Sequence, residues 1–310
     1  MNPGLNRFAI LVACATFFLI IAGALVTSNG AGLATPDWPL SNGQFLPPMV
    51  GNLFWEHGHR MVATTVGVLP IVLAVYVRLK EKREWIWKLA LFALIAVIAQ
   101  GLLGALTVKM YLPLAVSAAH ATLAQLFFCT TVSIAVFTSR SWMAAEPLDE
   151  EKDVLPLRYL CTAALVTIFL QLILGATLRH SASWDAPLPT ELIVAHVVGA
   201  IVVTLALGSA AVTTLRRHKD EPFLTRPAVI AVSLLVVQLF LGLAAYLTRA
   251  ASPKEPQPLN PMISITVAHV ACGALVFVST IVLTLRTYRV LPATAERSSW
   301  SARPQESQVT

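Results

Sequence analysis

Eight apolar stretches, each about 20 residues long, dominate the sequence. They run roughly over 8–27, 58–77, 88–108, 113–138, 158–178, 190–212, 227–247 and 262–285. About 20 apolar residues in a helix cross the roughly 30 Å of hydrocarbon in a bilayer, where a helix satisfies its own backbone polar groups. With 56% hydrophobic and only 12% charged residues, the chain is too apolar for a water-soluble domain. We therefore expect an all-α integral membrane protein with eight transmembrane helices.

The basic residues predict how the helices are oriented. Of the 22 Lys and Arg residues, 17 lie near the chain ends or in every second connection, against five in the other connections. The positive-inside rule then places both termini in the cytoplasm. The net charge of +6 therefore reports topology, and we expect no nucleic-acid partner. Short loops and the lack of an Arg- and Ser-rich leader favour a bacterial plasma membrane, and the first stretch is too long for a cleaved signal peptide.

An internal repeat divides the stretches into pairs. Three of them end with a glutamine followed four residues later by a glycine, and the next stretch then begins with a histidine. The sets are Gln100, Gly104 and His120; Gln171, Gly175 and His196; and Gln238, Gly242 and His269. The first hairpin has Leu19, Gly23 and His59 at the matching places. This repeat predicts four helical hairpins packed as two tandem pseudo-symmetric four-helix bundles, although close helix packing alone would also explain the glycines.

The repeat also predicts the domain boundaries. Residues 1–140 form the N-terminal bundle and residues 158–288 the C-terminal bundle. A cytoplasmic linker, 141–157, joins them. The tail, 289–310, is rich in Ser, Arg and Gln, a composition typical of disorder.

Four histidines, one at the start of the second helix of each hairpin, are the candidate functional residues. Ionisable residues inside membrane spans are rare and usually face a bundle interior or a functional site. Two imidazoles on facing helices can hold a haem between them, so four equivalent ones predict two haem sites. We expect the axial iron ligands to be His59, His120, His196 and His269. The other histidines, His180 and His218, are expected in solvated loops, and His57 beside the first ligand.

Bare metal ions are a weaker alternative. Zinc and iron sites usually include carboxylate or thiolate ligands, yet the stretches that carry His120, His196 and His269 contain almost no acidic residues. The four cysteines lie singly in apolar stretches, without a haem-attachment motif. A non-covalently held haem fits this pattern better.

The first hairpin departs from the repeat. Its connection, residues 28–56, is about thirty residues long, and a loop of this length is often functional. It ends in Glu56-His57-Gly58-His59-Arg60. In a helix, Glu56, His59 and Arg60 share one face and His57 points elsewhere. Glu56 is therefore either an acid or base beside a haem or the partner of Arg60 at a helix start.

These residues resemble the haem A synthase family, membrane enzymes that convert haem O into haem A for terminal oxidases. The resemblance rests on Glu56-x-x-His59-Arg60, on the preceding motifs Asn29–Leu33 and Pro36–Pro39, and on the three other ligand histidines, and it covers nearly the whole chain. Some members carry a cysteine pair in an outer loop, and this chain has none there. No thiol relay is therefore carried over from such relatives.

The resemblance implies an oxidoreductase in haem biosynthesis and cytochrome oxidase assembly. Two successive hydroxylations and loss of water would turn a ring methyl group of haem O into a formyl group. His59 and His120 would hold the substrate haem, His196 and His269 a haem B cofactor for electron transfer, and Glu56 would be catalytic. Arg60 and Arg179 are candidate partners of the haem carboxylates. Haem O synthase and the oxidase assembly pathway are candidate partners in the membrane.

Two other functions remain open at this stage. A bis-histidine cytochrome b that only carries electrons would explain the four histidines but leave Glu56 and the long loop without a role. A transporter built from repeats would place the histidines in a proton or metal pathway and predict no haem absorption.

Overall fold

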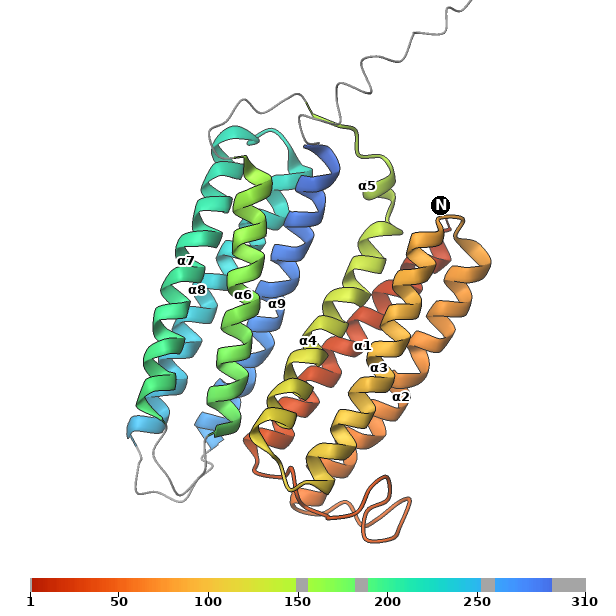
Figure 1. Ribbon diagram of the computed structural model, residues 1–310, viewed down its shortest axis with the longest axis vertical. Helices are drawn as coiled ribbons and strands as arrows, with labels where there is room; N and C mark the ends of the chain where they lie inside the picture. Colours follow the sequence, from red (N-terminus) through yellow and green to blue (C-terminus); the bar gives the residue numbers. More distant parts are fainter. Residues whose placement is uncertain (1, 149–155, 182–188, 252–259, 292–310) are drawn as a thin grey trace, which may run out of the picture.

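The computed structural model describes residues 2–148, 156–181, 189–251 and 260–291 (Figure 1). The described residues form α-helices and no strand. The helices are α1 (Pro3–Ser28), α2 (Asn52–Lys80), α3 (Glu84–Lys109), α4 (Leu114–Phe137), α5 (Arg140–Met143), α6 (Leu157–Ser181), α7 (Thr190–Arg217), α8 (Pro222–Ala251) and α9 (Asn260–Val290). Eight of them, all except the short α5, are long and apolar enough to cross a membrane. The predicted all-α fold with eight membrane-spanning helices is confirmed.

The eight long helices pack in two groups of four. In the first group α1, α2, α3 and α4 each contact the next, and α1 closes the ring by packing against α4. Helices α6, α7, α8 and α9 repeat this order of contacts, and Figure 1 shows the two groups next to each other. The groups meet where α1 and α4 pack against α6 and α9. That the two groups are related by pseudo-symmetry stays a prediction.

A shared apolar core joins the two groups. Phe128 of α4 stacks on Phe17 of α1 with ring centroids 5.6 Å apart, and both belong to the same core cluster as Phe277 of α9. Phe169 of α6 stacks on Phe277 at 6.3 Å. Each aromatic pair lies within one half and packs in the core cluster that the two halves share, where large rings contribute much of the buried apolar area.

The helices extend further than the apolar stretches. Helix α2 begins at Asn52 rather than near residue 58, which brings Glu56 and Arg60 into its first turns. Likewise α6 continues to Ser181, so the expectation that His180 lies in a solvated loop was wrong: it is half-buried in the last turn of α6. Apolar patterns mark only the part of a helix that lies in hydrocarbon, whereas hydrogen bonding continues the helix into the polar boundary. His218 directly follows α7.

Arginines stack on aromatic rings at the end of the molecule opposite the long loop. The Arg158 guanidinium lies 4.2 Å from the ring centre of Tyr288, and that of Arg286 lies 4.7 Å from the ring centre of Phe223. All the arginines in these stacks belong to the 17 basic residues expected in the cytoplasm. In such stacks the long arginine side chains cover apolar area at this end of the helices while their charge stays near water. The tail was predicted to begin at residue 289, but α9 continues to Val290, and residues 292–310 lie outside the described part of the chain.

Candidate functional site

A glycine faces a histidine in every hairpin. A Cβ atom added to Gly23 would lie 3.2 Å from Cε1 of His59, and one added to Gly104 would lie 3.2 Å from Cε1 of His120. The matching distances from Gly175 to His196 and from Gly242 to His269 are both 3.0 Å. Such distances are shorter than an unstrained carbon contact, so a larger residue would have to displace the ring that packs on the neighbouring backbone. The predicted repeat is therefore present as a repeated contact.

All four histidines lie toward the same end of the molecule. Each belongs to the early turns of α2, α4, α7 or α9, and each partner glycine lies in the later turns of the preceding helix. The chain enters these four helices from the end that carries the long loop, residues 29–51 (Figure 1). The four imidazoles therefore form one layer near that end.

The two histidines of the second half face each other. The ring centroids of His196 and His269 are 6.4 Å apart, with an angle of 67° between the ring planes. A metal ion binds imidazole nitrogen at about 2 Å, so two rings on opposite sides of one ion have centroids roughly 6 Å apart. The pair therefore has the separation that suits a single metal atom between them. In the first half, His59 and His120 lie close enough to interact electrostatically.

Buried ring nitrogens without partners point to a missing ligand. Nδ1 of His59, His120 and His269 is buried and has no hydrogen-bond partner among the described residues. Buried polar atoms are almost always paired, so these exceptions need an explanation. No group of three or more His, Cys, Asp or Glu side chains that could hold a bare metal ion occurs among the described residues. Paired imidazoles in apolar walls fit a haem, because the macrocycle supplies the other four ligands of its iron.

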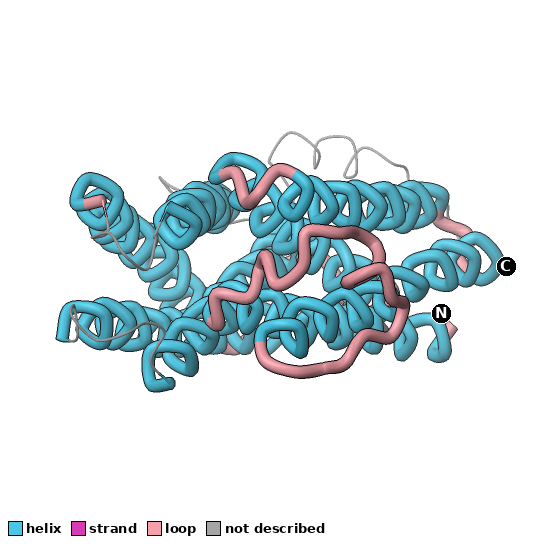
Figure 2. The backbone as a smooth tube through the Cα atoms, turned by 90° about the horizontal axis from the view of Figure 1, so that it is seen from below, coloured by secondary structure: helices cyan, strands magenta, loops and turns pink. Residues whose placement is uncertain are grey.

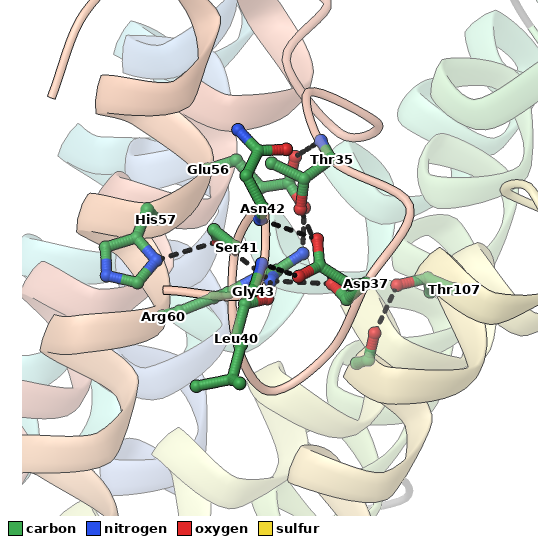
Figure 3. Close-up of polar contacts among 11 residues, drawn as sticks. Thr35, Asp37, Leu40, Ser41, Asn42, Gly43, Glu56, His57, Arg60 and Thr107 are labelled. Carbon is green, nitrogen blue, oxygen red and sulfur yellow. Dashed lines mark hydrogen bonds and ion pairs between the residues drawn. The ribbon is translucent and has the colours of Figure 1, made fainter. Parts of the chain in front are cut away.

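Arg60 organises the long loop. Its Nη1 donates to the carbonyl oxygens of Asp37 at 2.9 Å and Leu40 at 2.8 Å, and to Ser41 Oγ at 3.2 Å (Figure 3). Its Nη2 forms an ion pair with Glu56, one turn earlier in α2. The guanidinium therefore ties the loop to the start of α2, and Figure 2 shows the loop running across the ends of the helices.

Glu56 is buried, with 4% of its surface exposed. One carboxylate oxygen pairs with Arg60, and the other accepts a hydrogen bond from the backbone N–H of Thr35 at 3.0 Å. The predicted pairing with Arg60 is thus observed. Both oxygens of this buried carboxylate therefore have a partner, which offsets the cost of removing them from water.

His57 points away from the ligand layer, as its helical position predicts. Its Nδ1 lies 2.9 Å from Ser41 Oγ, and its Nε2 lies 3.1 Å from the carbonyl oxygen of Phe45. With Nε2–H donating to Phe45, Nδ1 accepts from the Ser41 hydroxyl. His57 is therefore fully used in holding the loop.

A tight turn at Asn42 and Gly43 closes the loop. Both have positive φ angles, 52° and 71°, which Asn and Gly adopt most readily. The Asp37 carboxylate accepts from the backbone N–H of Gly43 at 2.9 Å and of Asn42 at 3.0 Å. These bonds, led by the one from Gly43, lower the pKa of Asp37 to about 2.

Arg179 lies between the two halves. Its Nη2 donates to the Ala24 carbonyl oxygen at 3.2 Å and to Ser28 Oγ at 2.6 Å, which links α6 to the last turns of α1. Among the described residues it has no carboxylate within ion-pair distance. It also lies close enough to His269 for an electrostatic interaction. The guanidinium therefore places an uncompensated positive charge beside the ligand layer.

The sequence did not predict several of these contacts. Thr35 and Ser41 were not singled out, and Asn-Gly at 42–43 was the one available signal for a tight turn. The repeat pattern gave the three glutamines no role, and the structure places their amides against histidine rings.

The fold and the histidine layer define a class: helical membrane proteins that span the bilayer many times and carry paired imidazoles inside their helix bundles. The chain belongs to the cytochrome oxidase assembly protein family, whose sequence model matches residues 6–187. This family assignment confirms the resemblance drawn from the motifs.

Curated relatives support the same family. A protein named heme A synthase from Geobacillus kaustophilus (strain HTA426) is 25% identical over 98% of this chain and 99% of its own length. Heme A synthase from Bacillus licheniformis is 26% identical over 80% of this chain and 88% of its own. That of Bacillus cereus (strain 03BB102) is 24% identical over 81% and 86%. The similarity thus extends over both halves.

Proposed function

We propose that this protein is a haem A synthase, which oxidises a ring methyl group of haem O to a formyl group by two successive hydroxylations and loss of water. The observation that carries the proposal is the layer of four glycine-backed histidines. The relatives named heme A synthase support the choice of reaction. A bare-metal enzyme is disfavoured by the lack of carboxylate or thiolate clusters among the described residues.

The two histidine pairs have different roles in this proposal. His59 and His120 hold the substrate, haem O, and His196 and His269 hold a haem B cofactor. When bound, haem B supplies one-electron transfer to or from the substrate site. The long loop and Glu56 lie in the first half, which supports placing the chemistry there. The apolar core cluster shared by α1, α4, α6 and α9 holds the two halves together.

Glu56 is the proposed proton acceptor. It lies in α2 three residues before His59, and it is buried at the edge of the loop. Its contacts with Thr35 and Arg60 orient the carboxylate, whose oxygens would accept the proton. The loop that it anchors excludes water from that end of α2.

Arg179 is the proposed partner of a haem carboxylate. It is a guanidinium near the ligand layer without an ion-pair partner among the described residues, and Arg binds carboxylates well. Arg60 is the weaker candidate, because its Nη1 and Nη2 already contact the loop and Glu56. A haem carboxylate would have to share Arg60 with those groups.

The excess of basic residues supports an orientation with both termini in the cytoplasm and the histidine layer near the outer surface. The substrate would reach the layer from the membrane, where haem O synthase and the oxidase assembly pathway are the expected partners.

Pigment analysis tests the proposal directly. The full-length protein, expressed together with a source of haem O and purified in detergent, should contain haem A. A non-catalytic cytochrome b would contain haem B and leave haem O unchanged, and a transporter would be colourless. Either of the last two results would overturn the proposal.

A second measurement tests Glu56. Glu56→Gln keeps an oxygen that can accept from the Thr35 N–H, but it cannot take up a proton. We expect this variant to retain both haems and to lose formation of haem A. Full methyl oxidation by Glu56→Gln would remove Glu56 from the mechanism.

A further inference from the structure

We propose that Gln100, Gln171 and Gln238 are positioning residues that hold three of the four histidine rings in place, and that His59, which lacks such a glutamine, is the exchangeable ligand. The inference rests on the proposed function to the extent that it takes the histidines as haem ligands. It adds which ligand can leave the iron.

Two of the glutamines contact their histidines twice. The side-chain amide of Gln100 donates to the backbone carbonyl of His120 at 2.9 Å, and its nitrogen lies 3.4 Å from Nε2 of the same ring. The amide of Gln171 donates to the His196 carbonyl at 2.8 Å and lies 3.1 Å from Nδ1. An amide anchored on the backbone and placed against the ring restricts rotation of that ring. A neutral imidazole that binds a metal through one nitrogen carries its N–H on the other, so the glutamine must present its oxygen to that N–H. Oε1 of all three glutamines is buried and has no hydrogen-bond partner among the described residues, and a half-turn of the amide would bring it to the ring.

In the second half, each glutamine side chain also packs against a glycine of the histidine helix. Nε2 of Gln238 lies 3.2 Å from Nε2 of His269, and a Cβ added to Gly273, one turn after this histidine, would lie 3.1 Å from the same amide nitrogen. A Cβ added to Gly199 would collide with the Gln171 side chain in the same way. These glycines let the amides reach the histidine helix, so both rings of the second half are supported.

His59 lacks this support. The residue at the glutamine position of α1 is Leu19, which has no hydrogen-bonding group. Nδ1 is unpartnered among the described residues in His59, as in His120 and His269, but the latter two rings have a glutamine amide against Nε2. Of the two repeat residues that contact the other rings, the glutamine and the glycine, His59 has only the glycine, Gly23. A ring held on one side only can rotate away from a metal at lower cost than a ring also held by an amide. With haem bound, His59 would therefore be the histidine that is released from the iron most readily.

Carbon monoxide binding provides a test that does not depend on catalysis. The detergent-solubilised full-length protein, loaded with haem and reduced with dithionite, is mixed with carbon monoxide, which binds only where a histidine has left the iron. We expect a fast phase from the first half and a slow phase from the second. Leu19→Gln should slow the fast phase about fivefold, the effect of one neutral hydrogen bond.

Removing a glutamine should have the opposite effect. Gln171→Leu and Gln238→Leu should each speed the slow phase about fivefold. Gly199→Ala, which displaces the Gln171 amide without changing Gln171 or His196, should do the same. Gln125→Leu is the matched control, because Gln125 is a buried glutamine of α4 with no contact to a histidine ring among the described residues. Both phases should be unchanged in this control.

The outcomes separate this inference from the proposed function. A colourless protein would overturn the function itself. A haem-loaded protein in which Leu19→Gln leaves the fast phase unchanged, or in which Gln125→Leu alters the phases as much as Gln171→Leu does, would overturn the positioning role alone. If a glutamine variant fails to fold, Leu19→Gln still decides, because it adds a group and removes no polar contact.

Discussion

The two halves of the molecule place their histidines in the same way and differ in what surrounds them. In both, each ring packs on a glycine so closely that an added Cβ would lie 3.0–3.2 Å from it. In the second half, a glutamine also contacts each ring, and a glycine of the histidine helix receives that glutamine. In the first half, no glutamine contacts the His59 ring. The helix that carries His59 begins with the Glu56–Arg60 ion pair, and the long loop before it is hydrogen-bonded to Glu56. The comparison suggests that one scaffold serves a fixed cofactor in one half and a site for exchange and chemistry in the other.

The histidines should give the largest effects and show whether each half binds its own haem. We expect His269→Ala to reduce the haem-to-protein ratio by about half and to leave the pigment of the first half in place, because only one axial pair is lost. His120→Ala should remove the other half of the pigment. The ratio is measured by haem extraction from purified protein. His218→Ala, outside the ligand layer, is the control. Loss of all pigment from either single variant would show that the halves are not independent.

Arg60→Ala should release the long loop from α2, a connection that is particular to the first half. It removes the partner of buried Glu56 and the bonds to three loop residues, and breaking a buried pair from one side costs about 3–5 kcal/mol. The expected result is a lower melting temperature and faster proteolysis within residues 29–51. Lys88→Ala is the control, because the Lys88–Glu84 pair is 3.6 Å long and exposed and should contribute less than about 1 kcal/mol. Equal decreases in melting temperature in the two variants would contradict the role of Arg60 in holding the loop to α2.

The sequence predicted most of the fold because a bilayer allows few solutions. Runs of apolar residues long enough to cross it must be helical, and the repeat of Gly23 with His59, and of its equivalents, located the four glycine–histidine contacts. The hydrogen bonds from Arg60 to the long loop could not be predicted in this way. Its partners Asp37, Leu40 and Ser41 come together only through the turn at Asn42 and Gly43 and the path of the loop back to α2. The contact of Arg179 with α1 also depends on how the two halves pack, which no local pattern encodes.

The glycine contacts should show a smaller effect that compares the halves directly. Gly175→Ala and Gly242→Ala place a carbon 3.0 Å from a histidine ring, so we expect a loss of about 1–3 kcal/mol by overpacking. Gly23→Ala and Gly104→Ala, at 3.2 Å, should cost less. Thermal unfolding in detergent measures the series. Gly208→Ala is the control, since nothing lies within 4 Å of its added carbon, and alanine there should stabilise the helix by up to about 1 kcal/mol. Equal losses at all five positions would show that the rings are not what requires glycine.

Asp37→Asn should have the smallest effect, a slightly lower melting temperature near neutral pH that disappears in acid. Backbone hydrogen bonds, chiefly from Gly43, lower the pKa of Asp37 from 3.8 to about 2 in the folded protein. A carboxyl with a lowered pKa binds protons more readily when the chain is unfolded, so its stabilisation is complete above pH 3.8 and is lost as the pH falls toward 2. The melting temperatures of the wild type and of Asp37→Asn should therefore differ slightly near neutral pH and converge as the pH approaches 2. The second half offers the internal comparison: carbon monoxide binding at its haem should be the same in both proteins, because the Asp37 carboxylate accepts only from the turn at Asn42 and Gly43 and from Thr35 in the first-half loop. A difference in melting temperature that persists at pH 2 would mean that Asn at this position acts through loop packing and not through the charge of Asp37.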